Sequence, residues 1–363
     1  MSVTIKHIAE RVGVSKQAVS YALNGKTGQV SEQMRRRIEK AAKAMGYQPN
    51  WRARSFARKQ SRIIGLVYGR PADYVEGSQI VSRLVERLAA MQYELLLIPA
   101  TGPVEHWAHK LRDGRVDAAL VTHPMPLGLD EFVARHELPA VFLNLRSDAD
   151  LPQVCFDDVA GTRLAMDHLL KLGHQRITYF CTPKHHGQHY SNTDRRDTYI
   201  ACMAEAGLSA WTREEVSEYE PFVNSIVRTA PAERPTAVLC YNDFTAAGLR
   251  RPRGRLPGRA PEQTTIARSH TNQIPRDPPP PLTTIALPAD ELVDACVARL
   301  MPQIEARSHI PGLERVCLQE RLIVRDSTAA PAESNPEPFT PRSAGPLGDT
   351  SFPGRLTQTE VEQ

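Results

Sequence analysis

Short apolar runs alternate with helical patterns through most of the chain between residues 62 and 240. The runs RIIGLVY, YELLLIPA, VDAALVTH and LPAVFLN have the length and apolar content of buried strands, and amphipathic stretches such as SQIVSRLVERLAAMQ and VEHWAHKLRDG separate them. Because parallel strands need a crossover between them, this alternation predicts an α/β body whose sheet is covered on both faces. A second series, QRITYFCT, DTYIACMAEAGL and PTAVLCYN, predicts a second lobe, with a cleft between the two.

The first 46 residues have a different pattern, which predicts three short amphipathic helices. Thr4, Ser15 and Ser31 are suited to cap their N-termini, while Gly13 and Gly46 end the first and third. Apolar residues at helical spacing are expected to face inward: Ile5, Ile8, Ala9 and Val12; then Val14, Ala18, Val19, Ala22 and Leu23; then Ile38, Ala41, Ala42 and Met45. Three small amphipathic helices must share one core.

The second helix carries polar side chains on its outward face. A helix, a tight glycine turn and a helix that opens with polar residues is the arrangement of a helix-turn-helix, whose second helix enters the major groove. Gln17 can pair with adenine and Lys16 with guanine, while Ser20 and Tyr21 can reach base edges or phosphates. The alternative is a three-helix bundle with no role in nucleic-acid binding.

Charge is distributed unevenly along the chain. Residues 1–60 hold 13 Lys and Arg against three acidic residues, although the whole chain carries a net charge of only +4, so the remainder is net acidic. A basic head suits a module that neutralises DNA phosphates, because neutralisation releases condensed counterions. A solvated basic surface is the alternative explanation of the same composition.

Composition disfavours several other classes of protein. The six cysteines are scattered singly, without the spacing of a disulfide framework or a zinc site, and the N-terminus MSVTIKHIAE lacks an apolar signal region. No stretch approaches the length of a membrane span, so a cytoplasmic protein is expected. We expect no cofactor and no enzymatic activity, because no nucleophile with a base, carboxylate pair or phosphate loop stands at usable spacing.

Long segments of the N-terminal region resemble the headpiece and hinge of the lactose-repressor/galactose-repressor family. They are VTIKHIAERVGVSKQAVSYALNG, VSEQMRRRIEKAAKAMGYQPN and ARSFARKQSRIIGLV. The resemblance implies that Lys16, Gln17 and Tyr21 make the main base contacts. The full set of expected DNA-contacting residues is Thr4, Ser15, Lys16, Gln17, Ser20, Tyr21, Asn24, Ala53 and Phe56.

Residues 50–59 resemble the hinge helix of that family, which becomes ordered only on operator DNA. A segment this short is too small for a stable isolated helix, which fits folding on binding. Phe56 stands where the family usually has a leucine that wedges into the minor groove. An aromatic wedge can still unstack a base step, although its bulk puts the usual preference for a central CG step in doubt. The alternative is a simple linker whose Phe56 packs on the body.

The resemblance extends over the body through FDDVAGTRLAMDHLLKLGHQRITYF, RRDTYIACMAEAGL, PTAVLCYNDFTAAGL and PPLTTIALP. It implies a periplasmic-binding-protein-like domain of two Rossmann-like lobes that hold an effector between them. By resemblance, Asp157, Arg195, Asn242 and Asp243 line the effector site. Carboxylates and a guanidinium suit a polyol, because they form paired hydrogen bonds with adjacent hydroxyls. For each residue alone, the alternative is a surface ion pair or a loop cap.

These features predict a homodimeric or tetrameric repressor that reads a near-palindromic DNA operator. A sugar is the expected effector and an inducer, with co-repression by a purine-like ligand as the alternative. A solute-binding protein with the same body fold is the rival from another class. The basic headpiece and the lack of a signal peptide disfavour it.

Residues 249–281 depart from the family pattern. This segment holds eight prolines and seven arginines with little aliphatic periodicity, so neither a helix nor a buried strand is expected in it. Our hypothesis is that two compensating frame shifts replaced a helix and a core strand, and re-sequencing the gene would test it. A repressor that has lost effector sensing is therefore a further alternative.

The predicted domains are a headpiece over 1–48, the hinge over 49–61, the body over 62–326 and a disordered tail over 327–363. The tail is rich in Pro, Ser, Thr and Ala, without apolar periodicity. His185, His186 and His189 have plausible metal-ligand chemistry near Cys181. We expect a loop there instead of a metal site, because no second cysteine or carboxylate accompanies them at a set spacing.

Overall fold

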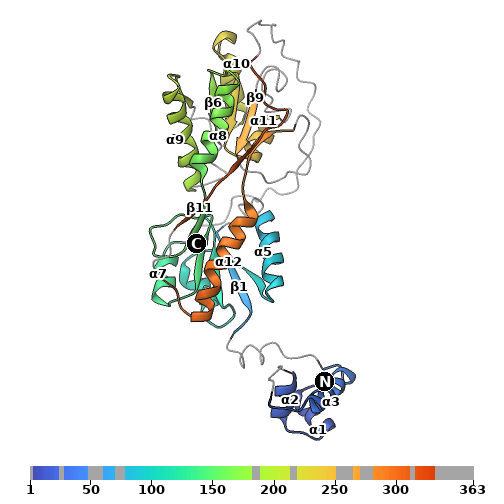
Figure 1. Cartoon of the computed structure of the whole chain (residues 1–363). Coiled ribbons are helices and arrows are strands. Elements are labelled where there is room, and N and C mark those ends of the chain that lie inside the picture. Colours follow the sequence, from blue (N-terminus) through green and yellow to red (C-terminus); the bar gives the residue numbers. More distant parts are fainter. Residues whose placement is uncertain are drawn as a thin grey trace, which may run out of the picture.

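The computed structural model comprises a helical headpiece and two α/β lobes (Figure 1). The residues that it describes are 3–23, 28–47, 60–69, 78–181, 189–212, 219–250, 265–269, 281–310 and 315–331. No helix within these ranges has both the length and the apolarity needed to cross a bilayer.

The headpiece consists of three helices around one small apolar core. They are α1 (Ile5–Val12), α2 (Lys16–Leu23) and α3 (Glu32–Ala44). Ser15 Oγ accepts from the Ala18 amide at 3.1 Å, and Ser31 Oγ accepts from the Met34 amide at 3.3 Å, so both serines cap helices as predicted. Ile8, Val19 and Ile38 are fully buried at the centre, one from each helix. Of the residues predicted to face inward, all except the half-buried Ala18 belong to this core or pack against it.

The N-terminal lobe is built on a six-stranded parallel sheet with the order β11-β5-β4-β3-β1-β2. Its strands are β1 (Ile63–Tyr68), β2 (Glu94–Pro99), β3 (Ala118–Val121), β4 (Ala140–Leu143), β5 (Gln153–Phe156) and β11 (Val316–Leu318). Helices α5 (Ser78–Ala90) and α12 (Ala289–Ala306) pack with Ile64 and Leu66 into one apolar cluster. Val67 belongs to a second cluster with α6 (Val104–Trp107) and α7 (Leu129–Arg135). Both faces of the sheet are therefore covered.

The helix expected over residues 104–114 is shorter than its pattern suggested. After α6 the backbone departs from helical geometry at Trp107 (φ −126°, ψ −26°), and residues 108–111 continue as a 3₁₀ turn. This change of pitch allows Trp107, Ala108 and Leu111 all to be buried.

The C-terminal lobe has a second six-stranded sheet, ordered β12-β10-β9-β8-β6-β7. Its strands are β6 (Ile177–Phe180), β7 (Trp211–Thr212), β8 (Ala237–Cys240), β9 (Thr265–Ser269), β10 (Thr283–Ala286) and β12 (Arg321–Ile323). All neighbours are parallel except β10 and β12. The helices are α8 (Asp158–Lys171), α9 (Tyr190–Glu205), α10 (Tyr219–Arg228) and α11 (Asp243–Arg250).

The expectation that residues 249–281 contain no sheet strand is wrong. Thr265–Ser269 form β9, which pairs in parallel with β8 on one side and with β10 on the other. A central parallel strand needs free backbone N–H and C=O groups on both sides, and these five residues include no proline. Helix α11 also continues to Arg250, two residues into the segment. The C-terminal sheet therefore keeps its central strand.

The predicted start of the disordered tail at residue 327 is also wrong. Ser327 is fully buried, and its Oγ accepts from the Thr283 amide at 2.8 Å. The Thr328 hydroxyl lies 2.9 Å from His168 Nε2, and Ala329 O lies 2.9 Å from His174 Nε2. These hydrogen bonds attach residues 327–329 to the lobe, whereas residues 332–363 lie outside the described ranges.

The chain crosses between the lobes three times. It passes from β5 to α8, returns from β10 to α12, and passes again from β11 to β12. Each lobe is therefore assembled from separate stretches of sequence (Figure 1).

Candidate functional site

The outward face of α2 presents the side chains expected to contact DNA. Lys16 and Gln17 are exposed, and Ser20 and Tyr21 are partly exposed beside them. Gln17 Nε2 donates to the Tyr21 hydroxyl at 2.6 Å, which holds the two side chains together one turn apart. Four polar side chains thus share one helix face without contributing to the core.

The remaining expected DNA contacts are placed only in part. Thr4 is exposed at the start of α1, and its amide donates to His7 Nδ1 at 3.2 Å. Ser15 is exposed at the cap of α2. Asn24, Ala53 and Phe56 lie outside the described residues, as does the hinge prediction for 50–59.

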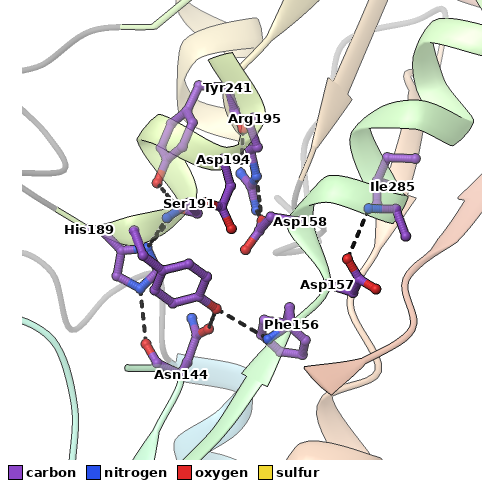
Figure 2. Close-up of polar contacts among 12 residues, drawn as sticks. Asn144, Phe156, Asp157, Asp158, His189, Ser191, Asp194, Arg195, Tyr241 and Ile285 are labelled. Carbon is purple, nitrogen blue, oxygen red and sulfur yellow. Dashed lines mark hydrogen bonds and ion pairs between the residues drawn. The ribbon is translucent and has the colours of Figure 1, made fainter. Parts of the chain in front are cut away.

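A buried ion pair lies where the lobes meet. Arg195 on α9 and Asp158 at the start of α8 are 3% and 1% exposed, and Arg195 Nε donates to Asp158 Oδ1 at 2.6 Å. Arg195 Nη1 also donates to the Tyr241 carbonyl at 2.7 Å (Figure 2). Burial lowers the pKa of Arg195, but the Asp158 carboxylate raises it by more, so the guanidinium stays protonated.

Glu320 adds a second carboxyl to this cluster from the β11–β12 crossing. Its side chain packs so closely over Gly161 of α8 that a Cβ at Gly161 would lie 1.6 Å from Glu320 Oε2, and only glycine leaves room there. Burial, reinforced by Asp158, raises the pKa of Glu320 well above its ordinary value. Burial therefore favours the neutral form of Glu320, which can donate as well as accept a hydrogen bond.

The cluster holds polar atoms that lack partners. Within the part of the chain that the structure describes, Asp158 Oδ2 and both carboxyl oxygens of Glu320 make no hydrogen bond although they are buried. Buried polar atoms are normally paired, so unpaired ones at a junction between domains favour a ligand or ordered water as their partner. These atoms could accept hydrogen bonds from hydroxyl groups.

The other expected effector residues surround this ion pair. Asn242 and Asp243 lie where β8 passes into α11 and are 2% and 1% exposed. Asn242 Oδ1 accepts from the Thr245 amide at 2.9 Å. Asp157 caps α8 by accepting from the Ala160 amide at 3.0 Å, and its other oxygen accepts from Gln319. The acid that contacts Arg195 is therefore Asp158, the neighbour of the expected site residue Asp157.

Further polar contacts join the lobes beside the ion pair. Asn144, at the end of β4, accepts from the Tyr190 hydroxyl at 2.7 Å through Oδ1, while its carbonyl lies 2.9 Å from His189 Nε2 (Figure 2). Arg146 pairs with Asp194 of α9, and its guanidinium lies 4.0 Å from the Tyr190 ring centre. Two residues after β4 thus contact the first two turns of α9.

Burial controls protonation in these contacts. Desolvation lowers the pKa of His189 to about 4, so its ring is neutral and can donate to the Asn144 carbonyl while accepting from Ser191. His185 and His186, the other members of the histidine run, lie outside the described residues.

Sequence reasoning missed several residues of this site. Asp158, Glu320, Asn144 and Tyr190 were not among the expected contacts. A signal for Asn144 was present, because it ends LPAVFLN in the way that Asn242 ends PTAVLCYN. Ligands of parallel sheets bind beyond the carboxyl ends of strands, where both asparagines lie. Glu320 carries no such signal, since its burial depends on a distant helix.

Comparison with known proteins agrees with this architecture. Residues 4–50 match the family of bacterial regulatory proteins, lacI family, and residues 166–328 match a periplasmic binding protein-like domain. The HTH-type transcriptional repressor PurR of Vibrio vulnificus (strain CMCP6) is 27% identical over 336 residues, covering 89% of this chain and 98% of the relative. The HTH-type transcriptional regulator GalR of Escherichia coli (strain K12) is 30% identical over 264 residues, covering 68% and 73%.

A solved structure shares the whole arrangement. The lac repressor dimer bound to operator and the anti-inducer ONPF superposes with a TM-score of 0.74 at 25% identity, covering 91% of this chain and all of that one. The match spans headpiece and both lobes. The chain is therefore a member of the lacI family of bacterial regulatory proteins.

Proposed function

We propose that the protein is a sequence-specific DNA-binding repressor whose affinity for its operator is changed by a small metabolite held between the lobes. The outward face of α2 supports DNA binding, because Lys16, Gln17, Ser20 and Tyr21 lie there outside the headpiece core. The basic excess of the headpiece supplies attraction to phosphates, and the side chains supply base readout.

The protein acts as a homodimer in the cytoplasm, and two headpieces read the half-sites of a near-palindromic operator. The similar lac repressor is a dimer bound to operator. Two-fold symmetry in the protein requires matching symmetry in the DNA, with half-sites separated by whole helical turns.

The effector binds at the cluster around Arg195, and a sugar fits its chemistry best. Asp158 Oδ2 and Glu320 offer unpaired acceptors, while both arginines of the junction already pair with carboxylates, Arg195 with Asp158 and Arg146 with Asp194. A neutral polyol with many hydroxyl donors suits this balance better than a phosphorylated ligand, whose negative charge would meet no unpaired cation among these residues. The site has a binding role and no catalytic one.

Fluorescence anisotropy of the purified protein on its own promoter DNA tests this proposal. We expect tight binding that weakens with salt, and one neutral sugar from a panel of sugars, sugar phosphates and nucleobases should shift it. Gln17→Ala should weaken specific binding to the promoter DNA by about 1–3 kcal/mol. Gln33 is exposed on α3, and Gln33→Ala should not weaken this binding. Absence of specific binding would contradict the repressor proposal.

Binding to DNA that no ligand shifts would favour the alternative of a repressor without a sensor. The intact order of the C-terminal sheet, with β9 paired on both sides, supports a working sensor instead.

A further inference from the structure

Two cysteine thiols face each other at the edge of the N-terminal sheet. Cys155 on β5 and Cys317 on β11 are register partners in parallel strands, and their Sγ atoms lie 3.4 Å apart. Adjacent strands are about 4.8 Å apart, which falls within the range of Cα separations that a disulfide spans. A shift of about 1.4 Å would bring the sulfur atoms to the bonding distance of about 2.05 Å.

The two thiols differ in access. Strand β11 is the outer strand of the sheet and Cys317 on it is exposed, whereas Cys155 is fully buried on the next strand inward. Burial raises the pKa of the Cys155 thiol to about 11, and the guanidinium of Arg146 acts in the opposite direction. An oxidant can therefore reach Cys317 first, and Arg146 stabilises the thiolate that Cys155 must form to react next.

We propose that Cys155 and Cys317 are a site of reversible oxidation, which a hydroperoxide converts into an intramolecular disulfide. The Cys317 thiolate attacks one peroxide oxygen and breaks the O–O bond, which gives a sulfenic acid and, for hydrogen peroxide, hydroxide. The Cys155 thiolate then attacks the sulfenic sulfur, and a second hydroxide leaves. Two thiols lose two electrons in all, and one peroxide becomes two waters after protonation. A dithiol such as dithiothreitol reverses the reaction by thiol–disulfide exchange.

The location of the pair gives the bond a consequence. Cys155 is two residues before Asp157, and Cys317 is two residues before Gln319, where the chain crosses into the C-terminal lobe. Gln319 Nε2 already donates to Asp157 Oδ2 at 2.7 Å, so the two crossings run side by side. A covalent bond just before both crossings fixes their spacing. Oxidation should therefore restrict the relative motion of the lobes, and this step rests on the function proposed above.

The chemical step is tested on the full-length protein treated with hydrogen peroxide and then with an alkylating reagent. We expect a cross-linked peptide pair containing Cys155 and Cys317, lighter by two hydrogens than the free peptides and absent after dithiothreitol. Cys317→Ser and Cys155→Ser should each abolish it, while Cys202→Ala on α9 should leave it unchanged. Alkylation of both thiols after peroxide treatment, or a dimer linked through Cys317 alone, would overturn the proposal.

The consequence is tested by anisotropy on promoter DNA. The probe is the sugar from the panel above that shifts DNA binding. The sugar concentration that releases half of the oxidised protein from DNA should differ by about tenfold from the concentration that releases half of the reduced protein, and Cys317→Ser should respond equally with and without peroxide. An identical effector response in both states would overturn the coupling to lobe motion. If neither state binds DNA, the proposed function fails, whereas the mass of the cross-linked peptide still decides the chemical step.

Discussion

Asp157 and Asp158 are adjacent carboxylates with different structural roles. Asp157 is partly exposed and caps α8, whereas Asp158 is buried against Arg195. Removing one partner of a buried ion pair leaves an uncompensated charge, so we expect Asp158→Asn to lower the free energy of unfolding by about 3–5 kcal/mol. Asp157→Asn should cost less than about 1 kcal/mol, because asparagine is also a good N-cap. Urea denaturation of both variants makes the comparison, and equal midpoints would refute the assignment.

His189 makes stability depend on pH in the acidic range. Its pKa is about 4 in the folded protein, against 6.5 for an ordinary histidine, so the unfolded chain binds a proton that the folded protein does not. This contribution to stability is fully present above pH 6.5 and is lost as the pH falls toward 4, amounting to roughly 3 kcal/mol at most. Between pH 7 and 5, His189→Gln should lose less stability than the wild type. The exposed His106→Gln variant should keep the wild-type slope.

At the scale of elements, α10 and α11 approach each other through a glycine. An added Cβ at Gly248 would lie 2.1 Å from Cε1 of the Tyr219 ring, which is too close for any contact. The Tyr219 ring also packs edge-on against the Phe180 ring, with 5.7 Å between the ring centres, so it cannot easily move aside. We expect Gly248→Ala to lower the free energy of unfolding by about 1–3 kcal/mol, as overpacking does.

A double variant separates overpacking at Gly248 from a loss of helix flexibility. Gly248→Ala combined with Tyr219→Leu should be less destabilised than the sum of the two single variants, because the smaller side chain makes room for the methyl group. Strict additivity in thermal denaturation would show that the ring is not the obstacle.

Elements whose stability is local were predictable from the sequence. The serine caps of α2 and α3 depend on neighbours three residues away, and the apolar spacing of Ile8, Val19 and Ile38 reports burial directly. Strand β9 was not predictable, because its place depends on backbone pairing with β8 and β10, which are distant in the sequence. Prolines on both sides of residues 265–269 disfavoured a strand in this part of the sequence, although these five residues can form backbone hydrogen bonds with a strand on each side.

Some residues of the candidate site were also predictable from the sequence, and others were not. Arg195 and Asn242 were expected at the site through resemblance, and both are buried at the junction of the lobes. Asp158, the acidic partner of Arg195, was missed although its neighbour Asp157 was expected at the site, since a helix cap and an ion-pair partner at consecutive positions have the same residue type. Glu320 was missed because its environment is set by Gly161, which is far from it in the sequence.

At the scale of the whole molecule, the Tyr190 hydroxyl joins the lobes. It donates to Asn144 Oδ1 and accepts from the Phe156 amide at 3.2 Å, so Tyr190→Phe leaves two groups of the N-terminal lobe unpaired. If Tyr190→Phe weakens the contact between the lobes by about 1.4 kcal/mol, the fraction of molecules in which the lobes have separated should rise about tenfold. Small-angle X-ray scattering should then give a larger radius of gyration.

Tyr199→Phe is the matched control for that measurement. The Tyr199 hydroxyl donates to the Ile177 carbonyl at 2.8 Å within the C-terminal lobe, so its loss should affect stability without changing the scattering. Unchanged scattering for Tyr190→Phe would show that this hydroxyl does not hold the lobes together.

The three crossings of the chain also determine the order of events during synthesis on the ribosome. The N-terminal lobe begins with β1, but its core includes Leu292, Cys296 and Leu300 of α12, and its sheet ends with β11. The lobe that is started first therefore cannot be completed until the second has almost wholly emerged. The headpiece, whose core is entirely its own, has no such constraint. A nascent chain would thus carry a folded DNA-reading module well before it acquires the body that regulates it.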